Sequence, residues 1–195
     1  MFRHGSIGLA PAAALAARWA GRESFHAGAI LAGGGAWILL GDKEAGKSTT
    51  IADFAMHTHG VMADDLVVLD GDAVLAGPRC IDLRATAAAH LGTGTALGVV
   101  GVRERWRLDL DSVPARAPLR GWVTLAWDTE LAVDTLQGAD RMLALLPFRS
   151  VRLAPDDAEV LMRLASFPVL RLRRPRQWDA LAPARERLLD AIARS

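Results

Sequence analysis

The chain has 195 residues, of which 51% are hydrophobic and 23% are charged, so its composition is that of a folded protein rather than a disordered one. This length suits one domain. The formal net charge of +1 argues against binding of nucleic acid through a broad basic surface. The one cysteine, Cys80, excludes an internal disulfide bond. Since no run reaches the roughly 18–20 apolar residues of a membrane span, we expect a cytoplasmic protein without membrane or nucleic-acid partners.

The first part of the chain alternates between helix and strand. Pro11 opens an apolar stretch that we interpret as a helix with proline in its first turn rather than as a secretory signal. Residues 36–40 are wholly apolar, which is typical of a strand buried on both faces. The other elements predicted here are a strand at 25–31, a loop at 41–47, a helix at 48–57 and strands at 61–63, 66–69 and 73–75.

The rest of the chain continues this alternation. Four glycines between residues 92 and 101 indicate a mobile loop that ends in a strand. Pro183 opens an amphipathic helix that extends to residue 194. The absence of a repeat or a clear linker favours one α/β domain over residues 1–195. The remaining predicted elements are helices at 84–91, 140–146 and 156–165 and strands at 105–110, 121–127 and 168–172.

The strongest motif is the segment 41–48, which matches the phosphate-binding loop G-x-x-x-x-G-K-[ST]. An apolar strand precedes it and a helix follows, as this loop requires. Backbone N–H groups and the positive end of the helix would surround the phosphates of a nucleotide. Lys47 would reach the β- and γ-phosphates, and the Ser48 hydroxyl would bind Mg²⁺. The candidate nucleotide-binding residues are Gly41, Asp42, Lys43, Glu44, Ala45, Gly46, Lys47, Ser48 and Thr49.

Two adjacent carboxylates, Asp64 and Asp65, follow the predicted strand at 61–63. A carboxylate at the end of a strand beside a phosphate loop can hold Mg²⁺, and a second one can accept the proton of a hydroxyl. A solvated acidic turn is the alternative for such a pair on its own. Asp82 is a weaker candidate for a metal contact. Arg79 and Arg84 flank it, and one of them could neutralise the γ-phosphate, although surface arginines around a short strand are the simpler interpretation.

Together these residues resemble the catalytic domain of HPr kinase/phosphorylase and, more closely, its stand-alone relatives, which are found among other places in gene clusters for modified peptides. The resemblance also rests on the segments 25–29, 63–65, 114–125 and 169–176. It implies a P-loop fold like that of phosphoenolpyruvate carboxykinase, with a mixed sheet and flanking helices. It also implies ATP-dependent phosphorylation of a serine-type hydroxyl.

The resemblance further implies roles for single residues. Asp64 would be the catalytic base, and Ser48 and Asp65 would help to place Mg²⁺. His26 would lie near the phosphates and, with Lys47, count among the catalytic residues, although a histidine satisfied within a strand is an equal alternative. The predicted cofactors are therefore ATP and Mg²⁺, and a homo-oligomer is expected only by analogy.

Three departures from the family qualify these expectations. Asp42, Lys43 and Glu44 stand where the family usually has small residues, which affects the expected rate of catalysis more than nucleotide binding. The family's RGxG segment has only Arg84-Ala-Thr-Ala as its nearest equivalent, so no reverse phosphorylase reaction is predicted. The family's separate N-terminal domain is not expected within residues 1–195.

The prediction from sequence is an Mg-ATP-dependent kinase that acts on the hydroxyl of a peptide, a protein or a small molecule. A catalytically weak nucleotide-binding sensor or scaffold is the alternative, because the altered loop carries Glu44. A GTPase or a transporter-type ATPase has less support, since the sequence lacks an Asn-Lys-x-Asp motif and a Leu-Ser-Gly-Gly motif.

Overall fold

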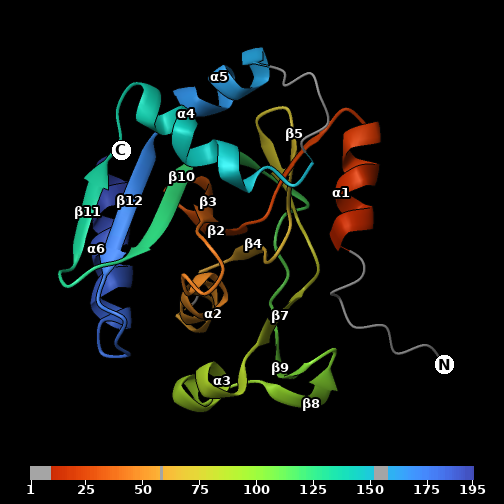
Figure 1. Cartoon of the computed structure of the whole chain (residues 1–195), viewed down its shortest axis with the longest axis vertical. Helices are drawn as coiled ribbons and strands as arrows, with labels where there is room; N and C mark the ends of the chain where they lie inside the picture. Colours follow the sequence, from red (N-terminus) through yellow and green to blue (C-terminus); the bar gives the residue numbers. More distant parts are fainter. Residues whose placement is uncertain (1–9, 58, 152–157) are drawn as a thin grey trace.

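The computed structural model describes residues 10–57, 59–151 and 158–195, which form a mixed α/β fold (Figure 1). Its helices and strands alternate along most of the chain, as predicted. In chain order the elements are α1 (Ala10–Trp19), β1 (Glu23–Phe25), β2 (Gly28–Ala32), β3 (Gly35–Leu40), α2 (Lys47–Met56), β4 (Val61–Ala63), β5 (Val67–Asp70), β6 (Ala73–Leu75), β7 (Cys80–Leu83), α3 (Ala85–Leu91), β8 (Thr95–Val100), β9 (Arg103–Asp109), β10 (Arg116–Trp127), β11 (Ala132–Thr135), α4 (Ala139–Leu145), the 3-10 helix η2 (Leu146–Phe148), α5 (Ala158–Ser166), β12 (Val169–Arg174) and α6 (Leu181–Ala193).

Within the described residues, a mixed nine-stranded sheet forms the body of the molecule. Its main order is β1-β5-β6-β10-β3-β2-β4, while β12 pairs with β10 and β11 pairs with β12. Strand β10 is parallel to both β3 and β12. Strand β2 is antiparallel to both β3 and β4, so β4 points the same way as β3. The carboxyl ends of β3, β4, β10 and β12 therefore meet at one edge, which is where open α/β sheets usually bind ligands.

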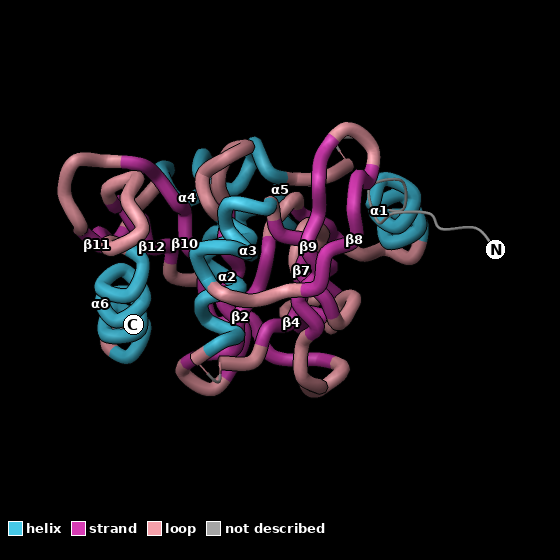
Figure 2. The backbone as a smooth tube through the Cα atoms, turned by 90° about the horizontal axis from the view of Figure 1, so that it is seen from below, coloured by secondary structure: helices cyan, strands magenta, loops and turns pink. Residues whose placement is uncertain are grey.

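Strand β3 is buried along its whole length because its residues alternate between two hydrophobic clusters. Ile38 and Leu40 pack in the cluster that includes Trp122 and side chains of α4 and α5. Trp37 and Leu39 pack in the other cluster, which includes side chains of α2 and α6. Figure 2 shows α2 and α6 beside the strands when the fold is seen from below. The prediction of a strand buried on both faces is confirmed.

A separate antiparallel sheet of order β7-β9-β8 projects from the body together with α3, at the bottom of Figure 1. We call residues 80–109 the side lobe. Cys80 and Asp109 are direct partners, so the lobe begins and ends at neighbouring points. The prediction of a mobile loop over 92–101 is wrong for most of that segment, because Thr95–Val100 forms β8 and pairs along β9. The glycines there serve a register shift and turns with positive φ.

The prediction of one strand over residues 25–31 is also wrong. The chain bends at His26, because β1 pairs with β5 whereas β2 pairs with β3 and β4. The His26 backbone N–H donates to the Phe148 carbonyl outside both strands. The start of the predicted helix at 156–165 lies partly outside the described residues, and α5 covers the remainder. No described helix is both long and apolar enough to cross a bilayer.

Candidate active site

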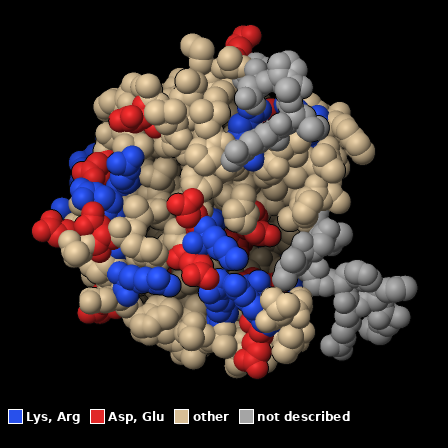
Figure 3. Space-filling view, viewed as in Figure 1, with Lys and Arg blue, Asp and Glu red and all other residues tan. Residues whose placement is uncertain are grey.

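A cleft of about 760 Å³ opens where β3, β4, β10 and β12 end. The phosphate loop and the start of α2 form one part of its wall, and residues of the side lobe form another. On the face drawn in Figure 3, acidic and basic side chains alternate over the area where α2 and β7 lie in Figure 1. Of the predicted site residues, the following line the cleft: His26, Gly41, Asp42, Lys43, Glu44, Gly46, Lys47, Ser48, Thr49, Asp64, Asp65 and Asp82. Ala45 is buried instead.

Lys47 holds the loop between β3 and α2 closed. Its Nζ atom donates to the Gly41 carbonyl at 2.5 Å and, more weakly, to the Asp42 carbonyl at 3.4 Å. The side chain is buried, and this burial lowers the pKa of Lys47, while the charge of Asp64 opposes the shift. Gly46 precedes the helix with a φ of 86°. The loop is thus shaped around its own lysine, and the first residues of α2 face the cleft.

Trp127 and Arg174 support this loop from the ends of β10 and β12. The Trp127 indole N–H donates to the Glu44 carbonyl at 3.1 Å, and the Arg174 guanidinium lies 4.4 Å from the Trp127 ring centroid. A Cβ atom at Gly46 would lie 2.8 Å from Arg174 and 3.1 Å from Trp127, so the position requires glycine. The sequence analysis missed both supporting residues. No local sequence signal marks them, because they reach the loop only through the parallel pairing of β10 with β3 and of β12 with β10.

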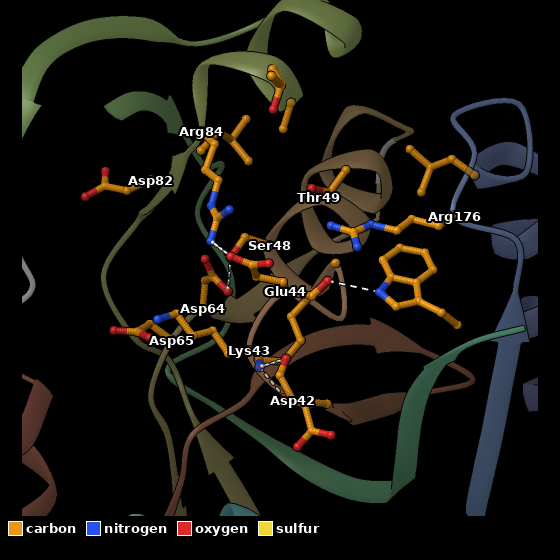
Figure 4. A pocket seen from close by; sticks show the side chains of 18 of the residues that line it. Asp42, Lys43, Glu44, Ser48, Thr49, Asp64, Asp65, Asp82, Arg84 and Arg176 are labelled. Atoms are coloured by element: carbon orange, nitrogen blue, oxygen red, sulfur yellow. Dashed lines mark hydrogen bonds and ion pairs between the residues drawn. The ribbon is translucent and has the colours of Figure 1, made fainter. Parts of the chain in front are cut away.

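Asp64 is the carboxylate that contacts the loop. The Ser48 hydroxyl donates to its Oδ1 atom at 3.3 Å, as the dashed line in Figure 4 shows. Burial raises the pKa of Asp64 to about 6, while the hydrogen bond from Ser48 opposes the shift and the charge of Asp65 adds to it. A carboxylate with this pKa binds a proton or a cation more readily than an exposed aspartate does.

Asp65 lies on the other side of Asp64 from Ser48 in Figure 4. Its φ of 70° places it in the left-handed region, which turns the chain after β4. The Asp65 Oδ1 atom lies 3.3 Å from Nδ1 of His26, and that ring nitrogen is also 3.0 Å from the Asp65 carbonyl oxygen. Both side chains are 56% exposed. His26 therefore belongs to an exposed polar pair in the cleft wall rather than to the interior of a strand.

Glu44 extends from the loop to the side lobe. Its carboxylate forms an ion pair with Arg84 at 3.0 Å, visible in Figure 4, and this hydrogen bond lowers the pKa of Glu44. Its φ of 71° is unusual for a residue other than glycine. Arg84 thus lies in the cleft, whereas Arg79 donates to the backbone carbonyls of Asp111 and Met62.

Asp82, the weaker candidate for a metal contact, lines the cleft from the side lobe. It accepts two hydrogen bonds from Arg107, at 2.9 and 3.1 Å. Its carboxylate is therefore paired within the side lobe, and the carboxylate beside Ser48 is that of Asp64.

The donor set suits a nucleotide-bound magnesium ion better than an independent metal centre. No group of three or more His, Cys, Asp or Glu side chains among the described residues is placed to hold a metal ion. Mg²⁺ in nucleotide sites is usually bound through one or two protein oxygens together with phosphate oxygens and water. Ser48 and Asp64, which already touch, fit that requirement.

No family model matches the sequence, and no curated protein matches it. Among solved structures, the HPr(Ser) kinase/phosphatase from Coxiella burnetii is similar over 88% of this chain and 95% of that chain, with 11% sequence identity and a TM-score of 0.40. At this distance the likeness assigns no family.

Proposed function

We propose that the protein is an Mg-ATP-dependent kinase that transfers the γ-phosphoryl group to a serine-type hydroxyl of a peptide, a protein or a small molecule. The contact between Ser48 and Asp64 carries this proposal. It joins a complete phosphate-loop motif to a partly buried carboxylate that follows β4, which is separated from β3 by β2 in the sheet. A glycine-bounded surface loop has no need of such a carboxylate. Mg²⁺, when bound by Ser48 and Asp64, would neutralise charge on the phosphates.

The chain's own groups divide the remaining work. Lys47 and the N–H groups at the start of α2 would bind the phosphates. Asp65, exposed and paired with His26, would accept the proton of the acceptor hydroxyl. The acceptor oxygen forms the new bond to phosphorus, and the bond between the γ-phosphorus and its bridging oxygen breaks to release ADP. This proposal exchanges the roles that were expected for Asp64 and Asp65, because Asp64 is the one that touches Ser48.

Calorimetric titration with Mg-ATP tests the proposal directly. Wild type should bind, and Lys47→Ala should lose at least tenfold in affinity because it removes a phosphate ligand. Arg171→Ala is the matched control, since it removes one positive charge from an exposed position on β12 outside the cleft. Asp65→Asn should retain nucleotide binding but lose transfer, measured as ADP release. A wild-type protein that does not bind Mg-ATP would refute the proposal.

A nucleotide-dependent sensor is the second candidate, and the ion pair between Glu44 and Arg84 favours it. Glu44 places a negative charge in a loop that would receive phosphates. A sensor would bind Mg-ATP as above, but its ADP release would be the same in wild type and in Asp65→Asn.

A further inference from the structure

Strand β9 directs arginines toward the cleft at alternate positions. Arg103 and Arg105 line the cleft, and Arg107 follows on the same face of the strand. Asp82 neutralises Arg107 through two hydrogen bonds. Neither Arg103 nor Arg105 forms a hydrogen bond or an ion pair with another described residue. Within the part of the chain that the structure describes, the Nε atom of Arg105 is moreover a buried donor without an acceptor.

This arrangement is unfavourable in the absence of a ligand. A buried donor that lacks an acceptor destabilises the folded state. Arg107 faces Asp82 on β7, whereas the residue opposite Arg105 on β8 is Gly98, which has no side chain to pair with a guanidinium group. Guanidinium groups are strong ligands for carboxylates and phosphates. Two neighbouring arginines that face a cleft and have no partner among the described residues therefore indicate an anion that those residues do not provide.

The neighbourhood shows that this side of the cleft attracts a carboxylate. Glu44 extends from the phosphate loop to Arg84 of the same lobe. The charges of Arg103 and Arg176 act on the Glu44 carboxylate as well and help to lower its pKa. The Glu44 carboxylate thus pairs with Arg84, while Arg103 and Arg105 can still bind another anion.

The arginine pair belongs to a different wall from the phosphate loop. Arg103 and Arg105 belong to the side lobe, whereas Lys47 and Ser48 belong to the body of the molecule. Figure 4 shows residues of the lobe, Asp82 and Arg84, on one side and Asp42 of the loop on the other, with Asp64 and Ser48 between them. A nucleotide on the loop and a second molecule against the lobe would therefore meet beside the carboxylates.

We propose that Arg103 and Arg105 form a subsite for a carboxylate or phosphate group of the molecule whose hydroxyl is phosphorylated. This inference rests on the proposed function and narrows its acceptor to an acid. The arginines hold the anionic group of the acceptor, and phosphoryl transfer from ATP takes place at its hydroxyl. A small hydroxylated acid or phosphate ester and an acidic peptide that contains serine both offer this chemistry.

The test uses the full chain saturated with Mg²⁺ and the non-hydrolysable nucleotide AMP-PNP, so that the phosphate loop is filled. The probes are glycerol 3-phosphate and the peptide Glu-Ser-Glu-Ser, with glycerol and Gln-Ser-Gln-Ser as their neutral counterparts. Calorimetry compares wild type with Arg103→Gln/Arg105→Gln. The control Arg116→Gln/Arg171→Gln loses the same charge from two exposed strand positions outside the cleft. The two single variants serve if the double variant does not fold.

At least one anionic probe should bind wild type tenfold more tightly than its neutral counterpart. The arginine variant should lose at least tenfold in that affinity, while the control stays within threefold, and nucleotide affinity should stay within threefold in all proteins. The probe that binds identifies the small molecule or the peptide as the acceptor type. Equal binding of charged and neutral probes would overturn the subsite. Unchanged probe affinity in the arginine variant would also overturn the subsite. A tenfold loss of nucleotide affinity in that variant would overturn it too, because the arginines would then bind the nucleotide.

Failure of the proposed function gives a different result. If wild type does not bind AMP-PNP, the probes are titrated into Lys47→Ala without nucleotide, where the principal cation of the loop is gone. Anion binding that then depends on Arg103 and Arg105 supports the subsite without the kinase. Absence of that binding overturns the subsite too.

Discussion

Replacing Asp64 with asparagine should stabilise the magnesium-free protein. Burial raises the pKa of Asp64 from 3.8 to about 6, so the folded chain binds this proton more tightly than the unfolded chain does. The contribution of Asp64 to stability is therefore fully present below pH 4 and is lost as the pH rises through 6. A shift of about two pKa units corresponds to about 3 kcal/mol at most. Asparagine avoids this loss, because it carries no charge and can still accept the hydrogen bond from Ser48.

The assay is thermal and urea unfolding in EDTA between pH 5 and pH 8. At pH 8, Asp64→Asn should unfold about 6–12 °C above wild type, since about 3 kcal/mol in a chain of this length shifts Tm by that much. At pH 5 the gain in free energy of unfolding should fall to about half. Asp65→Asn is the control, because it removes the same charge from a side chain that is 56% exposed. If Asp64→Asn is no more stable than this control at pH 8, burial does not disfavour the Asp64 charge and the reasoning fails.

Three further changes test other contacts. Arg185→Met leaves the buried Asp53 carboxylate without its ion pair at 2.7 Å and should lower the free energy of unfolding by about 3–5 kcal/mol in urea denaturation; a loss below 1 kcal/mol would contradict this. Gly46→Ala should destabilise more than Gly71→Ala does in the same assay. Both glycines have a positive φ, but only a Cβ atom added at Gly46 would meet neighbouring atoms. Equal losses of unfolding free energy in the two variants would therefore contradict the close packing around Gly46. Trp127→Phe removes the indole hydrogen bond to the phosphate loop and should weaken Mg-ATP binding about fivefold by calorimetry, while an unchanged affinity would show that this support is dispensable.

The parts of the site that sequence reasoning predicted are local in the chain. The loop after β3 and the helix that begins at Lys47 follow from one short motif, and Asp64 and Asp65 follow from a strand end. The sequence alone could not show which of the two carboxylates, Asp64 or Asp65, contacts Ser48. Ser48 contacts Asp64 because of how β4 aligns with β2, and the left-handed φ of Asp65 then directs that residue to His26. No sequence motif indicates this strand alignment or these side-chain contacts.

The parts that were missed depend on contacts between distant segments. Trp127 and Arg174 reach the phosphate loop only because β10 and β12 are parallel to β3 and β10, respectively. The glycines of residues 92–101 indicate a loop when they are considered alone, yet pairing with β9 satisfies the backbone of β8. Glycine content predicts backbone freedom, but it does not reveal whether a partner strand is present.

The side lobe is topologically an insertion. Cys80 and Asp109 are partners in one antiparallel strand pair, so the polypeptide leaves the body and returns to it at the same place. None of the strands of the nine-stranded sheet lies within the side lobe. The lobe nevertheless packs on the body, because Ile81, Leu83 and Ala88 share a hydrophobic cluster with Ile51 and Phe54 of α2. Substitution of the lobe residues that line the cleft, rather than of those that pack on α2, is therefore the route by which this insertion can change what the cleft binds while the phosphate loop and Asp64 stay where they are.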